Sequence, residues 1–198
     1  MPSGWTPTLK WWTTPAPTHS GFVLGWVGDP SQDLDLADIH DAVYTVLRSR
    51  PELHLAVAGS PGAYQAFDDV SESRKLFLPM VGAEDFPYLL AHFDVLLNPV
   101  RPSSWSALGS AQRLMEAGAR GLAWLASPAP ALTEWSAGGA FCSTTSEWVA
   151  AIERLIDDDA WRESLCRAGR EQAQSRRAEA IGRLWQAAIS GLLSGIRD

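Results

Sequence analysis

A hydroxyl, a basic and an acidic side chain recur at intervals of three in the middle of the chain, at Ser110, Arg113 and Glu116. Such residues share one face of a helix, and apolar spacing over residues 107–119 predicts that helix. A helix N-terminus carries unpaired N–H groups and partial positive charge, which favour a phosphate. Arg113 would add a forked cation, and the Glu116 carboxylate could accept two ribose hydroxyls. Spacing alone favours a simpler alternative, a solvated helix face with an Arg–Glu pair.

The segment before this helix carries a further candidate for an anion site. An apolar run over residues 94–100 predicts a strand that ends near Pro99 and Pro102, and the next residues hold Arg101, serines and a tryptophan. The formal net charge of the chain is −7, which argues against a nucleic-acid backbone as partner. An anionic ligand would therefore need a local basic site, and Arg101 and Arg113 are the candidates.

Strand-like apolar runs alternate with helical patterns along the whole chain. Strands are predicted at residues 22–27, 53–58, 75–80, 94–100, 122–126 and 140–142, and helices at 36–50, 63–70, 83–93, 107–119, 146–156, 160–175 and 178–195. Alternation of this kind forms a parallel sheet with helices on both faces. The sequence predicts an α/β fold, a three-layer, doubly wound, Rossmann-like parallel sheet of about six strands with C-terminal helices. We expect residues 1–20 to be an extended lead-in and residues 21–198 to be one domain.

Doubly wound sheets bind ligands at the carboxyl ends of their strands, where the strand order reverses. Five predicted loops meet at that edge, namely residues 28–31, 59–62, 81–82, 99–106 and 127–130. We expect the binding site among these loops.

Composition indicates a soluble globular protein with reduced thiols. Of the 198 residues 46% are hydrophobic and 20% are charged, and no apolar run approaches the length of a transmembrane segment or signal peptide. Cys142 and Cys166 have no metal-ligand spacing, so free thiols in the cytoplasm are the expectation. Three of the ten tryptophans crowd the first twelve residues, where we expect them to pack against other parts of the chain.

Other chemistries lack their signatures in this sequence. The histidines show no ligand spacing, which predicts no metal site. The run of three aspartates at residues 157–159 lacks the glycine and distal glutamate of a calcium loop, so helix capping is the expectation. No G-x-G-x-x-G, P-loop or G-x-S-x-G motif is present. We expect no cofactor.

Several segments in order resemble one enzyme family. Residues 113–117 (RLMEA) followed by Gly121 resemble its K/R-x-x-E-A…G segment, and Glu134 with Trp135 resembles the start of the helix after the next strand. Residues 146–148, 155–158 and 161–165 resemble its closing helices. The chain is thus similar to the C-terminal, nucleotide-sugar donor-binding domain of GT-B-type retaining glycosyltransferases (glycosyl transferases group 1).

The resemblance assigns roles to named residues. Glu116 would hold the ribose hydroxyls, Arg113 the diphosphate, and the backbone at Val81 and Gly82 the base. Backbone amides at Gly28, Gly109 and Ser110 would add donors to the phosphates. The candidate donor-binding residues are Gly28, Asp29, Val81, Gly82, Arg101, Gly109, Ser110, Arg113 and Glu116. The catalytic residues are not identified by the resemblance.

The chain also departs from the family pattern. Leu108 stands where many members carry a second glutamate, and Asp29 and the next four residues offer no basic side chain. The resemblance does not extend to the acceptor-binding half of GT-B enzymes, so we expect a separate N-terminal-domain partner chain or self-association.

Two functional hypotheses remain open, with a third less favoured. The first is a glycosyltransferase domain that binds a nucleotide-diphosphate sugar donor for hexosyl transfer and is inactive alone. The second is a non-catalytic assembly module with a degenerate GT-B half-fold. A flavodoxin-like regulatory domain is less favoured, because no acidic cluster marks the strand ends.

Overall fold

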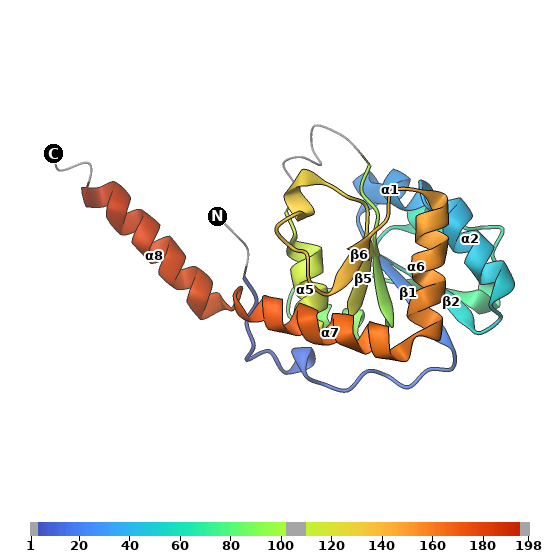
Figure 1. The fold of residues 1–198 in the computed structure, drawn as a ribbon, viewed down its shortest axis with the longest axis horizontal. Coiled ribbons are helices and arrows are strands. Elements are labelled where there is room, and N and C mark those ends of the chain that lie inside the picture. Colours follow the sequence, from blue (N-terminus) through green and yellow to red (C-terminus); the bar gives the residue numbers. More distant parts are fainter. Residues whose placement is uncertain (1–3, 102–109, 195–198) are drawn as a thin grey trace.

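A computed structural model describes residues 4–101 and 110–194 and shows a six-stranded parallel sheet between helices (Figure 1). The strand order is β3-β2-β1-β4-β5-β6, and every pair is parallel. The strands are β1 (Phe22–Val27), β2 (Leu53–Ala58), β3 (Lys75–Leu78), β4 (Val95–Asn98), β5 (Ala123–Ala126) and β6 (Gly139–Phe141). The prediction of a doubly wound, Rossmann-like sheet is confirmed.

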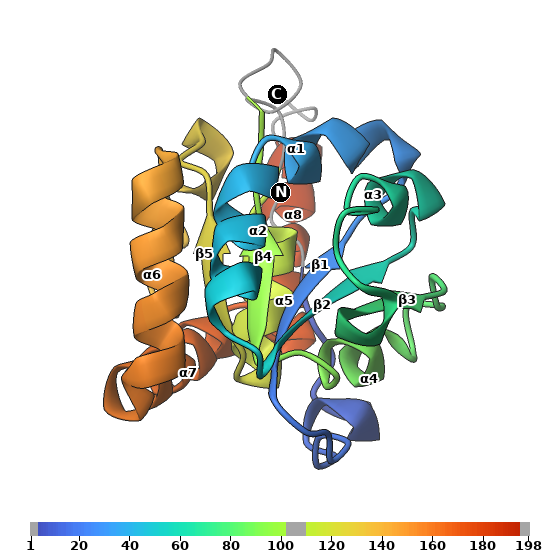
Figure 2. The ribbon, with the colours of Figure 1, turned by 90° about the vertical axis from the view of Figure 1, so that its right-hand side faces the viewer.

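The helices cover both faces of the sheet, because neighbouring strand residues point to opposite sides. Leu96 belongs to the core under α4 (Phe86–Leu90) and α5 (Gln112–Arg120), whereas Leu97 belongs to the core under α2 (His40–Ser49) and α6 (Thr145–Asp157). Figure 2 shows α2 and α6 in front of the strands and α5 behind them. The helices are α1 (Asp33–Ala37), α2 (His40–Ser49), α3 (Pro61–Gln65), α4 (Phe86–Leu90), α5 (Gln112–Arg120), α6 (Thr145–Asp157), α7 (Asp159–Gln174) and α8 (Ala178–Ser194).

The helix predicted over residues 36–50 is in fact two helices. The Ile39 amide donates to the carbonyl of Leu36 at 3.2 Å, three residues back, and this tighter turn ends α1 before α2 begins. Helix α1 also begins earlier than predicted, directly after the 3₁₀ turn η2 (Pro30–Gln32). The predicted strand at 75–80 and the predicted helices at 63–70 and 83–93 are likewise shorter than expected.

The prediction that Glu134 and Trp135 begin a helix is wrong. They follow the 3₁₀ turn η5 (Pro130–Leu132) and continue without helical structure toward β6. The side chain of Gln172, on α7, holds this segment open, since its Nε2 donates to the Glu134 carbonyl and its Oε1 accepts from the Ala137 amide, each at 2.9 Å. A helix would need those backbone groups for its own bonds.

The N-terminal segment packs against the domain, as its tryptophans predicted. Trp5 and Trp12 are buried, and the indole Nε1 of Trp5 donates to the Ala173 carbonyl at 2.7 Å. Arg120 at the end of α5 donates to the carbonyls of Trp12 and Thr14. The segment also contains a 3₁₀ turn, η1 (Lys10–Trp12), and so is not extended throughout.

The last helix projects away from the rest of the molecule (Figure 1). Ile181 is buried at its base, but Leu184, Trp185, Ile189, Leu192 and Leu193 are between 47% and 71% exposed. Among the described residues, no helix has both the length and the apolar character that crossing a membrane requires.

Candidate functional site

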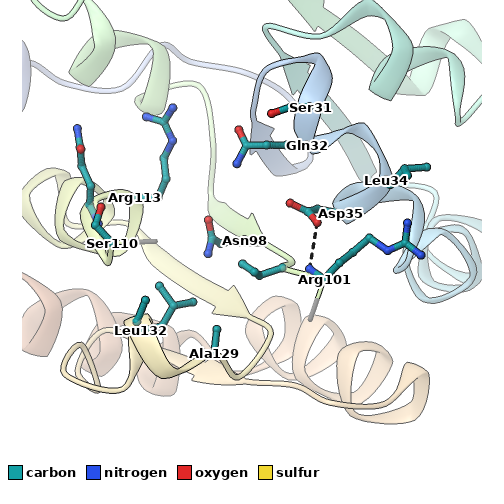
Figure 3. A pocket seen from close by; sticks show the side chains of 13 residues that line it. Ser31, Gln32, Leu34, Asp35, Asn98, Arg101, Ser110, Arg113, Ala129 and Leu132 are labelled. Carbon is teal, nitrogen blue, oxygen red and sulfur yellow. Dashed lines mark hydrogen bonds between the residues drawn. The ribbon is translucent and has the colours of Figure 1, made fainter. Parts of the chain in front are cut away.

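A pocket of about 790 Å³ lies at the carboxyl edge of the sheet beside β1 and β4. These strands are neighbours, and the sheet order reverses between them, which is where doubly wound folds bind ligands. The chain leaving β1 contributes one wall, the chain leaving β4 the floor, and the start of α5 another wall (Figure 3). Its polar lining residues are Ser31, Gln32, Asp35, Asn98, Arg101, Ser110, Gln112 and Arg113.

Arg113 and Glu116 form the ion pair that their spacing predicted. Arg113 Nη1 lies 3.0 Å from Glu116 Oε2, and the Gln112 amide donates to Glu116 Oε1 at 2.9 Å. The side chain of Glu116 is only 11% exposed and does not line the pocket, whereas the side chain of Arg113 is 31% exposed and lines it. The Arg113 guanidinium also covers the Phe86 ring, 4.5 Å from its centroid. A buried carboxylate held by two donors is more constrained than a solvated pair on a helix surface.

Ser110 does not share the helix face predicted for it. Helix α5 begins at Gln112, so Ser110 lies before it, and its hydroxyl accepts weakly from the Gln112 amide at 3.4 Å. Ser110 nevertheless lines the pocket (Figure 3). Gly109 and Leu108 fall in residues 102–109, outside the described part of the chain.

Hydrogen bonds within the loop after β1, and one to the end of β2, already use the backbone amides of this loop. The Gly28 amide donates to the Ala58 carbonyl at 3.1 Å, within the sheet. Asp29 caps the following turn, since its Oδ1 accepts from the amide and hydroxyl of Ser31 at 2.8 and 2.6 Å. The Ser31 hydroxyl, the Ser31 amide and Arg113 all hold the pKa of Asp29 below its usual value. The Gly28 amide proposed as a phosphate donor is thus already engaged.

Arg101 turns away from Arg113. Its Nε lies 2.9 Å from Asp38 Oδ2, and its backbone amide donates to Asp35 Oδ1 at 3.0 Å. In Figure 3 its side chain extends away from Ser110 and Arg113. Burial raises the pKa of Asp35, more than the Arg101 amide lowers it. Arg101 therefore closes one end of the pocket in an acidic setting and does not reinforce the charge of Arg113.

Val81 and Gly82 do not line this pocket. Val81 packs against the core on the α5 side, and Gly82 is exposed, with its carbonyl accepting from the Asp85 amide at 3.1 Å. Their loop leads into α4, whose first residue is Phe86 beneath Arg113. This loop therefore lies near Arg113, but its residues do not form part of the pocket wall.

Five polar lining residues were not among the candidates chosen from the sequence, namely Ser31, Gln32, Asp35, Asn98 and Gln112. Asn98 is the last residue of β4, and Ser31 and Gln32 lie in the turn after β1; a position at the carboxyl end of a strand is itself a signal for a ligand site. Gln112 lies four residues before Glu116, a spacing at which helical side chains meet. Among the residues that the structure describes, no group of three or more metal-ligating side chains gathers.

Comparison with known protein families shows to which family the chain belongs. The family described as Glycosyl transferase-like matches residues 40–184, most of the chain. The chain belongs to this glycosyl transferase-like family. No curated protein matches its sequence.

Solved structures of glycosyltransferases share the fold of this family member. The C-terminal domain of LpcC, a glycosyl transferase group 1 protein from Francisella tularensis, aligns with a TM-score of 0.67 and 16% identity over 87% of this chain and 98% of that one. Sucrose-phosphate synthase from Thermosynechococcus elongatus aligns with a TM-score of 0.72 and 18% identity over 98% of this chain and 52% of that one. A TarM variant from S. aureus, in complex with UDP among other molecules, aligns with a TM-score of 0.67 and 13% identity over 88% of this chain and 37% of that one.

The coverage shows which portion of a glycosyltransferase this family member corresponds to. It spans nearly all of the LpcC C-terminal domain, but about half of the sucrose-phosphate synthase chain. The fold is therefore that of a GT-B C-terminal domain.

Proposed function

We propose that the β1–β4 edge binds the nucleotide-diphosphate sugar donor of a retaining hexosyl transfer. The observation that carries this proposal is the buried Glu116 carboxylate, fixed beside the switch-point pocket by Gln112 and Arg113. Membership of the glycosyl transferase-like family and the UDP bound by TarM support the same ligand class.

Glu116 has the capacity to bind ribose in this position. A carboxylate offers about four lone-pair sites, and Gln112 and Arg113 take one on each oxygen. The remaining sites suit two hydroxyl donors, because vicinal ribose hydroxyls can reach the two oxygens of one carboxylate. Arg113, whose side chain is 31% exposed at the pocket wall, supplies the cation for the departing diphosphate.

The acceptor site belongs, in this proposal, to a second domain. The chain spans about half of sucrose-phosphate synthase and 37% of TarM. A transfer reaction needs the acceptor hydroxyl held in line with the anomeric carbon, and positioning of this kind accounts for ~7–11 kcal/mol of a barrier. We therefore propose that this chain alone binds the donor without turning it over.

The cytoplasm is the compartment we propose for this reaction. Cys142 and Cys166 are both free thiols, as expected where the redox buffer keeps cysteines reduced.

A second candidate function is a non-catalytic assembly module. The specific observation in its favour is helix α8, which carries five large apolar side chains that are at least 47% exposed. Such a face is typical of a surface that a partner covers. This alternative is favoured if the protein self-associates or binds a partner but no nucleotide.

A thermal-shift screen tests the proposed function. The panel comprises nucleosides, their 5′-diphosphates and the corresponding nucleotide sugars, with wild type and Glu116→Ala compared at one protein concentration. A ligand at ~100 times its dissociation constant stabilises the fold by ~2.7 kcal/mol, so a clear upward shift in wild type and a smaller one in Glu116→Ala are expected. No shift for any nucleoside or nucleotide would reject donor binding.

A further inference from the structure

We propose that Asp29 is a specificity-determining residue that occupies donors a phosphate would use and repels the phosphate by its charge, so that this site gains little affinity from a diphosphate. The inference rests on the proposed function and adds that recognition comes mainly from the nucleoside part of the donor. The supporting observation is that the backbone N–H groups of the loop after β1 already donate hydrogen bonds within the protein.

Every backbone N–H in this loop already has an acceptor. Phosphate-binding loops after the first strand work by leaving N–H groups directed at the ligand. Here the Gly28 amide donates to Ala58, the Asp29 amide donates to the Gln32 side chain at 3.2 Å, and Pro30 has no N–H. The Ser31 amide donates to Asp29 Oδ1, and the Gln32 amide donates to the Asp29 carbonyl at 2.9 Å.

The Asp29 carboxylate takes the place that an anionic ligand would take. Its Oδ1 accepts from both the amide and the hydroxyl of Ser31, which lines the pocket. A phosphate oxygen in this loop would compete for those two donors and meet a like charge. The Asp29 carboxylate, an anion of the protein itself, therefore already holds the donors of Ser31 that a phosphate would need.

The surrounding charge reinforces this competition. Four aspartates follow β1 within residues 29–38, and no lysine or arginine lies among them. Arg113 is paired with Glu116 and Arg101 with Asp38, so neither guanidinium is without a carboxylate partner. In the sequence, residues 102–109 contain no charged side chain.

The uncharged lining of the pocket suits a nucleoside or sugar. Ser31, Gln32, Asn98, Ser110 and Gln112 offer hydroxyl and amide groups, and Leu132 adds an apolar wall. Such groups bond to ribose, sugar hydroxyls or base edges without requiring charge. The site therefore discriminates among donors by these neutral contacts.

Titration calorimetry at low salt tests the role of Asp29. Uridine with UDP, and guanosine with GDP, are titrated into wild type, Asp29→Asn and Glu163→Gln. Asparagine caps helical turns as well as aspartate does, so this change removes charge while keeping a cap. Glu163→Gln removes one charge from α7, which crosses the opposite end of the sheet from α1 (Figure 1).

The inference predicts a specific pattern of affinities. Wild type binds the diphosphate no more than about fivefold more tightly than the nucleoside, and Asp29→Asn tightens the diphosphate alone by about fivefold. Glu163→Gln changes neither affinity. Circular dichroism and the melting temperature check that Asp29→Asn is folded.

Three outcomes overturn it, and they separate it from the proposed function. A hundredfold preference of wild type for the diphosphate leaves donor binding intact and removes this role of Asp29. An unchanged ratio of nucleoside to diphosphate affinity in folded Asp29→Asn does the same. Absence of binding by every ligand to every variant rejects the proposed function and this inference with it.

Discussion

The Arg113 guanidinium is shared between the Phe86 ring, 4.5 Å from its centroid, and Glu116, 3.0 Å from Oε2. This arrangement links α4 to α5 beside the pocket and fixes the direction of the only cation on the α5 side of the described pocket lining. The charge and the planar shape of Arg113 therefore both matter, and lysine would not replace it.

Replacing Arg113 by glutamine should separate the two parts of a nucleotide. We expect Arg113→Gln to lower affinity for a nucleoside diphosphate more than for the nucleoside, because only the diphosphate interacts with the charge. The loss should shrink as salt rises, since screening weakens exposed charge interactions. Calorimetry at low and high salt measures both effects. Equal losses for nucleoside and diphosphate would show that Arg113 does not contact phosphate.

The N-terminal tryptophans should contribute to stability through one hydrogen bond in particular. Trp5→Phe keeps a ring in the buried site but removes the Nε1 donor to Ala173. We expect the free energy of unfolding to fall by about 1–3 kcal/mol, the cost of an unpaired buried group. Urea denaturation measures it, with Trp11→Phe, at a half-buried ring beside Tyr88, as the milder control. Equal effects of the two changes would mean that the bond to α7 is unimportant.

Helix α8 should drive self-association in the absence of another partner. Its exposed side chains Leu184 and Leu192 are 53% and 71% exposed, and burying them against a second copy removes apolar surface from water. Sedimentation velocity over a concentration series should show growing weight-average mass for wild type and none for Leu184→Glu/Leu192→Glu. Gln186→Glu adds charge to the same helix as a control. A wild type that stays monomeric throughout would refute this prediction.

Cys142 should make stability depend on alkaline pH. Burial, aided by Glu147, raises the pKa of its thiol from an ordinary 9.0 to about 11. Between these values the unfolded chain has lost the proton that the native protein keeps, so stability falls as pH rises from about 9 to 11. The difference in unfolding free energy between wild type and Cys142→Ala should shift against wild type in that window. A difference that stays constant with pH would contradict the raised pKa.

Much of the fold was predictable because it depends on local pattern. The runs at Phe22–Val27 and Leu53–Ala58 are strands with the predicted bounds, since strands buried on both faces are continuously apolar. The non-helical path at Trp135 was not predictable, because it depends on Gln172, 37 residues away. The Gln172 side chain hydrogen-bonds to the backbone at Glu134 and at Ala137, on either side of Trp135.

The site shows the same division between local and distant causes. The Arg113–Glu116 pair follows from helical spacing and was predicted, as was the strand edge that holds it. The engagement of the Gly28 amide by Ala58 and of Arg101 by Asp38 depends on which strands and loops become neighbours. Sequence spacing carries no information about such partners, so it could not show that the Gly28 amide and the Arg101 guanidinium are already engaged.

In the proposed function, Glu116 binds the ribose of a nucleotide at the β1–β4 edge. The direct test is calorimetric titration of wild type and Glu116→Ala with the nucleotide that gives the largest thermal shift. We expect measurable binding to wild type and a loss of about 1–3 kcal/mol in the variant, the value of a hydrogen bond to a charged group. Equal affinity of wild type and folded Glu116→Ala would contradict it.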